Sequence, residues 1–141
     1  MGRIMAIDYG IKRTGLAVTD PEQIIATALA TVDTNKLMPY LDEYCRREEV
    51  ERFVVGEPKH MDNTPSESAR LIEPFLKALA ARFPQIPVSR MDERFTSKMA
   101  FQAMIDGGLG MKRRRDKALV DTVSAVLILQ NFMQLNDNTK Q

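Results

Sequence analysis

Acidic residues at three positions of this sequence have the type and placement needed for metal-dependent chemistry. Asp8 directly follows the apolar run at residues 4–7, Asp92 and Glu93 close a segment that begins at Pro87, and Asp121 lies on a predicted helix. Clustered carboxylates repel each other unless a cation binds, and hard ions such as Mg²⁺ prefer oxygen ligands. Two such ions about 4 Å apart can activate a water and stabilise the leaving oxygen when a phosphodiester is cleaved. The pattern therefore predicts a carboxylate and metal site that acts on phosphodiesters.

The first two positions also have structural interpretations. Asp8 is suited to a turn that continues through Gly10. Asp92 and Glu93 are suited to the cap of a helix that starts near Thr96, because acidic side chains stabilise helix N-termini. Against this, ligands in open α/β sheets bind at the carboxyl ends of the strands, which is where these residues are predicted to lie. Both interpretations remain open for each position.

Asp121 is the most informative of the acidic residues. On a helix that begins near Asp116 it shares one face with Ala125 and Ile128, so it is predicted to point toward the core. It lies beyond the first turn, where the helix dipole favours acidic side chains. A carboxylate on a buried face needs a partner, which is either Lys117 in an ion pair or a metal ion.

Basic residues adjoin all three acidic positions. They are Lys12, Arg13, Arg94, Lys112, Arg113, Arg114 and Arg115. One basic run alone is usually a solvated loop, but co-location with the carboxylates favours contacts to a nucleic-acid backbone. The formal net charge is only +1, so overall charge does not by itself indicate such a partner.

Length and composition indicate one globular domain. We assign residues 1–134 to it and expect residues 135–141 to be a polar, disordered tail. Hydrophobic residues make up 44% and charged residues 28%, an ordinary globular balance. No apolar run approaches the roughly 18 residues of a membrane span, so no membrane association is expected. Cys45 is the single cysteine and His60 the single histidine, which excludes an internal disulfide and most zinc sites and fits a reducing cytoplasm.

Hydrophobic periodicity predicts a mixed α/β order of elements. Strands are predicted at residues 3–8, 14–19, 26–32, 51–56 and 87–92, and helices at residues 36–47, 66–83, 97–105 and 116–133, with a polar loop at 58–65. The apolar stripes that should face the core are Leu37, Leu41 and Tyr44 in the first helix, and Leu71, Phe75, Leu76 and Leu79 in the second. Strands in hairpins followed by strands alternating with helices imply a mixed sheet.

Four stretches carry a resemblance to a known family. They are IDYGIKRTGLAVTD at residues 7–20, FVVGEPKHMD at 53–62, MDERFTS at 91–97, and residues 112–130 with the basic run and Asp121. In order and spacing the chain resembles, over nearly its whole length, the YqgF or RuvX-like proteins, pre-16S rRNA nucleases related to the Holliday junction resolvase RuvC.

The resemblance implies an RNase H-like fold, with a five-stranded mixed sheet flanked by helices. It implies a catalytic site of Asp8, Asp92, Glu93 and Asp121, in which Asp8, Glu93 and Asp121 bind Mg²⁺ or Mn²⁺. The implied partner is nucleic acid: the 5′ end of pre-16S rRNA first, and branched DNA as the alternative.

Two departures from the family pattern concern the loop after the fourth predicted strand. Glu57 stands where the family has Leu in a Gly-Leu-Pro motif, and no glycine follows Asp62 where the family has one. These differences put substrate contacts of that loop in doubt and leave the acidic site untouched.

Other classes of function fit parts of the sequence. A junction resolvase would act as a symmetric homodimer, whereas a ribonuclease could be a monomer. A non-catalytic RNA-binding assembly factor would also bind precursor rRNA. The segment DYGIKRTG is loosely similar to the phosphate-binding hairpin of actin-like ATPases, but those use two domains and this chain has the length of one.

Overall fold

A sheet of five strands with helices on both faces forms the described part of the chain. The computed structural model describes residues 2–57, 67–92 and 117–139. In chain order the elements are β1 (Arg3–Asp8), β2 (Arg13–Thr19), β3 (Ala26–Asp33), the 3₁₀ helix η1 (Thr34–Lys36), α1 (Leu37–Arg47), β4 (Val50–Glu57), α2 (Glu67–Arg82), β5 (Val88–Asp92) and α5 (Lys117–Thr139).

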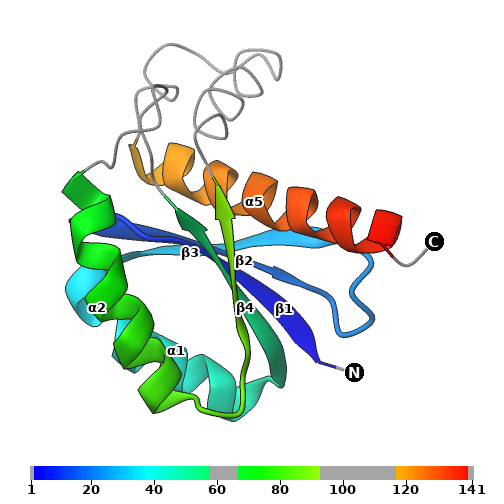
Figure 1. Cartoon of the computed structure of the whole chain (residues 1–141), viewed down its shortest axis with the longest axis horizontal. Coiled ribbons are helices and arrows are strands. Elements are labelled where there is room, and N and C mark those ends of the chain that lie inside the picture. Colours follow the sequence, from blue (N-terminus) through cyan, green and yellow to red (C-terminus); the bar gives the residue numbers. More distant parts are fainter. Residues whose placement is uncertain (1, 58–66, 93–116, 140–141) are drawn as a thin grey trace.

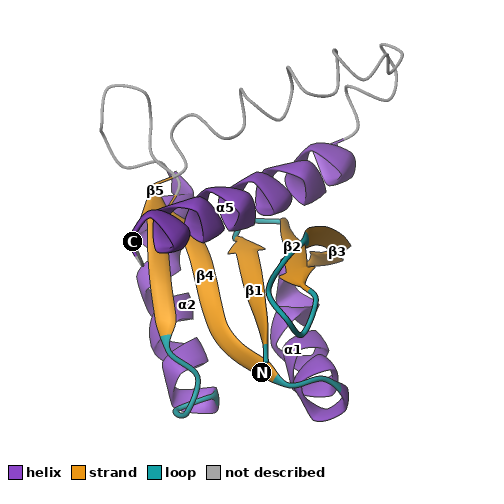
Figure 2. Cartoon of the chain, turned by 90° about the vertical axis from the view of Figure 1, so that its right-hand side faces the viewer, coloured by secondary structure: helices purple, strands orange, loops and turns teal. Residues whose placement is uncertain are grey.

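The strand order across the sheet is β3-β2-β1-β4-β5, so β1 is central. β1, β2 and β3 pair antiparallel in sequence, whereas β4 is parallel to β1 and β5 is parallel to β4. The predicted mixed sheet and its β1–β2 hairpin are thus confirmed. Helices α1 and α2 cover one face of the sheet and α5 crosses the other (Figures 1 and 2).

The face toward α1 and α2 holds the larger of two apolar clusters. Strand alternation sends Met5, Ile7, Phe53 and Val55 to this face. The other fully or largely buried members are Leu16, Val18, Leu37, Leu41, Tyr44, Val50, Ile72, Phe75 and Leu79. The predicted stripe of α1 is confirmed. In α2, Phe75 and Leu79 are buried and Leu76 is partly buried, while Ile72 is a core residue that the periodicity analysis missed.

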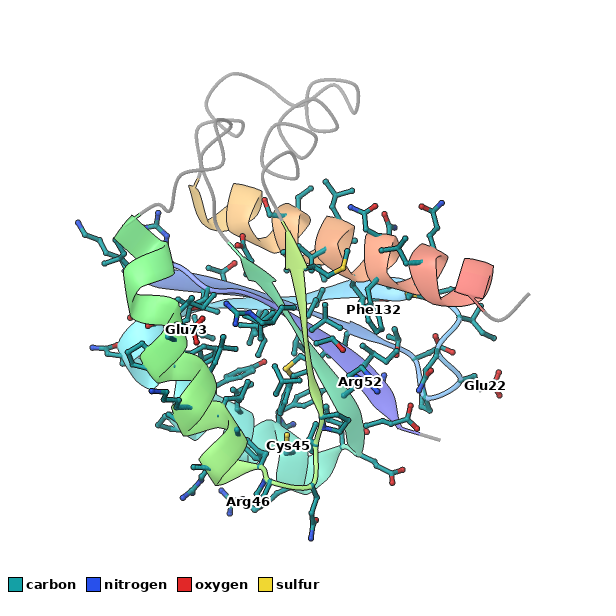
Figure 3. All side chains as sticks on the ribbon, viewed as in Figure 1. Glu22, Cys45, Arg46, Arg52, Glu73 and Phe132 are labelled. Carbon is teal, nitrogen blue, oxygen red and sulfur yellow. The ribbon has the colours of Figure 1, made fainter. Side chains whose placement is uncertain are left out.

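The face toward α5 holds a smaller cluster with smaller side chains. Its buried members are Ile4, Ala6, Ala17, Val54, Ala125, Ile128 and Leu129. Phe132 packs against them from the same helix, and Figure 3 shows its ring below α5, on the side of the sheet. Ala125 and Ile128 were predicted to face the core, and they do. Alanines at the contact let the helix approach the sheet closely.

Several boundaries differ from the prediction. Helix α5 continues through residues 135–139, which we expected to be a disordered tail. The assignment of residues 1–134 as the domain remains a prediction. The 3₁₀ helix at Thr34 precedes α1, which begins at Leu37. The helix predicted at residues 97–105 and the loop at 58–65 lie outside the described residues. Within the described ranges, no helix has the length and apolar character needed to cross a bilayer.

Candidate acidic site at the carboxyl edge of the sheet

Three neighbouring parallel strands each end with an acidic residue at the carboxyl end of the sheet. We call these three strand ends the acidic edge. β1 ends at Asp8, β4 at Glu57 and β5 at Asp92. Glu57 is directly paired with Asp92, and Ile7 with Val55, so the three ends lie nearly level. Asp8 and Asp92 were predicted site residues from the sequence, whereas Glu57 was noted only as a departure from the family pattern. Strand order, which spacing along the chain does not reveal, places Glu57 between them.

Asp8 belongs to the face of the sheet that α5 covers. Ile4 and Ala6 of the same strand pack in the α5-side cluster, and residues two apart on a strand share a face. Asp8 is partly buried, as expected where a strand leaves the core. The prediction that it sits at the carboxyl end of a central strand is confirmed.

Helix α5 begins over the end of the sheet at which β1 ends, and runs back toward the opposite end (Figure 1). The backbone of Asp121 lies in the second turn of this helix, three and four residues before the buried Ser124 and Ala125. The side chains of Asp121, Asp92 and Glu57 are not among those described. A meeting of Asp121 with Asp8 therefore stays a prediction.

Of the predicted basic residues, the structure describes the two that follow Asp8. Lys12 is exposed and Arg13, the first residue of β2, is partly buried. Lys12 lies on the connection between β1 and β2 and Arg13 directly follows it, so both adjoin the acidic edge. The other predicted residues lie outside the described ranges: Glu93, Arg94, Lys112, Arg113, Arg114 and Arg115.

The connection between β1 and β2 is anchored at its start and turns tightly at Gly10. The ring of Tyr9 stacks on Phe75 of α2, with centroids 4.6 Å apart. At Gly10 an added Cβ would lie 2.3 Å from the carbonyl oxygen of Arg13, so a larger residue would force the turn open. The turn that carries Lys12 is therefore tight, and its start is held by the α1/α2 side of the protein.

The donors that the edge offers are oxygens, which suits a hard divalent cation and does not suit a thiol- or imidazole-binding metal. Among the side chains that the structure describes, no three His, Cys, Asp or Glu residues are grouped to hold a metal ion. The buried hydroxyl of Ser124, close to Asp121 along α5, has no hydrogen-bond partner within the described part. The residue types fit such an ion, and Asp8 is the one proposed ligand whose side chain is described.

Among the side chains that the structure describes, shifted pKa values occur on other parts of the molecule. The bidentate hydrogen bonds from Arg82 hold the pKa of Asp42 below its usual value, with Nε–Oδ1 and Nη2–Oδ2 distances of 2.7 and 2.6 Å. Burial raises the pKa of the Cys45 thiol, which lies on α1 (Figure 3). The Asp42–Arg82 contact joins α1 to α2, and the Cys45 shift follows from its burial on α1. Neither group lies at the acidic edge.

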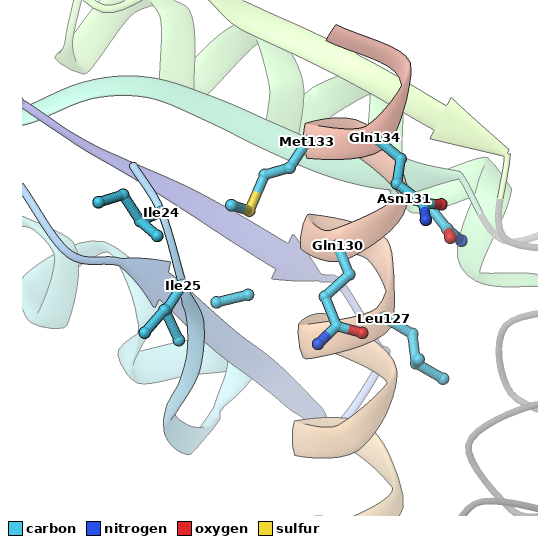
Figure 4. Close-up of a pocket in the computed structure, with 8 residues that line it drawn as sticks. Ile24, Ile25, Leu127, Gln130, Asn131, Met133 and Gln134 are labelled. Atoms are coloured by element: carbon cyan, nitrogen blue, oxygen red, sulfur yellow. The ribbon is translucent and has the colours of Figure 1, made fainter. Parts of the chain in front are cut away.

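A groove of about 490 Å³ lies between α5 and the residues before β3 (Figure 4). Its described lining consists of Ile24, Ile25, Ala26, Leu127, Gln130, Asn131, Met133 and Gln134. None of these side chains is charged, so the described lining offers a phosphate no cation. It is separate from the acidic edge.

The sheet order and the helix that crosses it define the class of protein as RNase H-like. The structure of Thermus thermophilus RuvC in complex with a Holliday junction substrate matches with a TM-score of 0.59 and 21% identity, over 94% of this chain and 96% of that one. A second structure of T. thermophilus RuvC matches with a TM-score of 0.57, 19% identity and 95% and 96% coverage. At these identities the likeness shows the fold alone.

Sequence comparison then identifies the family. The family model described as "RuvX: Holliday junction resolvase" matches residues 2–135. A relative from Christiangramia forsetii is 58% identical over 94% of this chain and 98% of its own length, and one from Porphyromonas gingivalis is 56% identical over 97% and 99%. Both carry the name "Putative pre-16S rRNA nuclease". The chain belongs to the RuvX family.

Proposed function

We propose that this chain is a nuclease that hydrolyses a phosphodiester bond at the 5′ end of pre-16S rRNA. The observation that carries the proposal is the acidic edge: Asp8 and Asp92 end parallel strands at one side of the sheet, where α5 with Asp121 begins. Membership of the RuvX family, and the pre-16S rRNA nuclease names of relatives more than half identical to this chain, support RNA as the substrate.

In this proposal Asp8, Glu93 and Asp121 bind Mg²⁺ or Mn²⁺, which would activate the attacking water and stabilise the leaving oxygen. The choice of Glu93 over Asp92 follows the resemblance to the family, and the alternation of β5 bears on it. Met91 packs against the α5-side cluster, and residues two apart on a strand share a face. Glu93 would share the face of Asp8 if this alternation continued to residue 93, which lies outside the described residues. On this basis Asp92 is expected to matter less to activity.

The basic residues would bind the phosphates that flank the cut. Lys12 and Arg13 adjoin Asp8 in the structure, and we assign the same role to Arg94, Lys112, Arg113, Arg114 and Arg115. Such contacts raise affinity for any backbone without reading bases. We expect binding that weakens as salt concentration rises.

The test is cleavage of a precursor rRNA fragment and of a synthetic four-way DNA junction, with Mn²⁺ and with EDTA. Asp8→Asn should reduce RNA cleavage by more than about 100-fold, beyond the typical effect of losing an outer-shell partner of a metal. Its free energy of unfolding should change little, because asparagine keeps the shape of aspartate at this partly buried position. Glu43→Gln is the matched control: it removes an acidic charge from α1, on the opposite face of the sheet, and should cleave normally.

The outcomes separate the candidate functions. Normal cleavage by Asp8→Asn would show that the proposed site is wrong. The second candidate function is a Holliday junction resolvase, which the description of the family favours. Junction-selective cutting by a homodimer would support it. Tight RNA binding without cutting by the wild-type protein would indicate an assembly factor.

We also infer that the protein acts in the cytoplasm as a monomer or homodimer. The rRNA substrate and the single, unpaired cysteine are the basis for the location. Analytical ultracentrifugation of the wild-type chain with and without RNA would determine its oligomeric state.

A further inference from the structure

Thr34 makes three hydrogen bonds to the connection that carries Lys12 and Arg13. Its hydroxyl donates to the carbonyl oxygen of Gly10 at 2.8 Å, and its backbone N–H donates to the carbonyl oxygen of Lys12 at 2.9 Å. Its Oγ1 also lies 2.9 Å from Oγ1 of Thr14. A hydroxyl has one proton to donate, so Thr14 is the donor in that pair.

The three contacts fall on alternate residues, positions 10 and 12 of the connection and position 14 of β2. Thr34 comes from a different part of the chain, the start of η1 after β3. Arg13 of β2 pairs with Asp33 of β3, and this pairing brings Thr34 next to the connection. The connection is thus held at one end by Tyr9 on Phe75 and along its length by Thr34.

The hydrogen bonds of Thr34 are not needed to close the β1–β2 hairpin. The antiparallel ladder already joins β1 to β2 from Met5↔Val18 to Asp8↔Gly15. The additional bonds act on the segment beyond the ladder, whose tip is exposed to solvent at Ile11 and Lys12. A cationic side chain on an otherwise mobile turn would lose conformational entropy on binding, and a preformed turn avoids part of that cost.

We propose that Thr34 is a positioning residue for nucleic acid: it holds the turn so that the cations at Lys12 and Arg13 meet a backbone phosphate beside Asp8. The inference rests on the proposed function, and it assigns Thr34 no contact with substrate. Since the cations would contact phosphate in both the ground state and the transition state, the effect belongs to affinity and KM and not to kcat.

The test compares Thr34→Val, which keeps the shape and removes the hydroxyl, with Thr34→Ser, which keeps the hydroxyl. The probe is an RNA oligonucleotide that matches the 5′ end of a small-subunit rRNA precursor. Thr34→Val should weaken binding and raise KM between about twofold and tenfold, the range of one net hydrogen bond. The value of kcat should be unchanged and Thr34→Ser should bind nearly as well as wild type. Thr27→Val, the same change at an exposed position of β3, is the control and should bind as wild type does.

A double-mutant cycle with Lys12→Ala separates positioning from general stability. If Thr34 acts through Lys12, the two changes together should weaken binding less than the product of their separate effects. Thr34→Val should also lower the slope of log affinity against log salt by up to about 0.7, the value of one phosphate contact on a single strand.

The results distinguish failure of this inference from failure of the proposed function. If Lys12→Ala weakens RNA binding but Thr34→Val does not, Thr34 is not a positioning residue and the nuclease proposal stands. The same conclusion follows if Thr34→Val lowers only the free energy of unfolding, with KM and the salt slope unchanged. If the wild-type protein neither binds nor cuts RNA, the proposed function is wrong and the role of Thr34 falls with it.

Discussion

The two faces of the sheet are built from different side chains. Toward α1 and α2 the core contains large apolar groups, among them Phe53, Leu41 and Leu79, each fully buried. Toward α5 the contact is made largely by small ones, including Ala6, Ala17 and Ala125. The first face has the larger buried apolar volume, and the second has the carboxylate of Asp8 at its edge.

This difference indicates that one face of the sheet mainly stabilises the fold and the other mainly positions the proposed site. Burial of large apolar groups on the α1/α2 face supplies much of the free energy of folding. The small residues of the α5 face set the distance between helix and sheet, and in the proposed site that distance would decide how close Asp121 comes to Asp8. Substitutions on the first face, away from the contact of Phe75 with Tyr9, should therefore change stability alone, and substitutions on the second should change stability and activity together.

The largest expected effect on stability is that of Phe53→Ala. The ring of Phe53 is fully buried and meets Phe83 edge to face, with centroids 5.5 Å apart. Its removal should lower the free energy of unfolding by about 3–5 kcal/mol, through lost transfer energy and the cavity left behind. Urea denaturation measures this change. Cleavage per folded molecule, measured at low temperature, should stay near wild type, and a large fall in kcat would contradict the comparison.

A smaller loss of stability, combined with a loss of activity, is expected for Ala125→Leu. The added carbons have no space between α5 and the sheet, where Ala125 is fully buried, so overpacking should cost about 1–3 kcal/mol. Because the helix must shift away from β1, kcat should fall even under conditions where the variant is fully folded. Circular dichroism during denaturation and single-turnover cleavage give the two quantities.

Gln130→Leu is the matched control for that experiment. Gln130 lies on the exposed side of the same helix, so a leucine there adds apolar surface without moving α5. Normal kcat in Gln130→Leu with reduced kcat in Ala125→Leu would locate the effect at the contact between helix and sheet. Equal values of kcat in both variants would show that the spacing of α5 does not control activity.

The smallest expected effect concerns the surface of the α1/α2 side. Asp42 of α1 is bonded to Arg82 of α2, and this contact lowers the pKa of Asp42. Its contribution to stability is present above the ordinary Asp pKa of about 3.9 and is lost as pH falls through the lowered folded value. Asp42→Asn should cause a small fall in Tm at pH 7, with the difference from wild type disappearing in acid.

Two observations would bear on that last prediction. Glu43→Gln, which disrupts ion pairs within α1 only, should leave Tm nearly unchanged. Cleavage by Asp42→Asn should equal that of wild type, since the pair lies far from the acidic edge along α1 and α2. A fall in Tm that persisted at a pH low enough to protonate Asp42 in the folded protein would show that the charge of Asp42 is not its cause.

The elements of the fold were predictable where periodicity was strong. The strand at β1, the stripe of Leu37, Leu41 and Tyr44, and the core position of Ala125 follow from apolar spacing alone. Local spacing predicted element ends less well. It also missed Ile72, because the width of the buried stripe on α2 depends on how the helix lies against the sheet. The continuation of α5 past residue 134 was missed because its last turns are polar.

For the site, sequence alone indicated which residues have the chemistry, since carboxylates after apolar strands and nearby cations can be read from the chain. Only the tertiary structure decided which of them share an edge: the parallel order β1-β4-β5 brings Glu57 between Asp8 and Asp92, and the β2–β3 ladder brings Thr34 onto the turn at Gly10. These are contacts between segments far apart in the chain. Their register depends on the packing of the whole sheet, so no local pattern of residues encodes it.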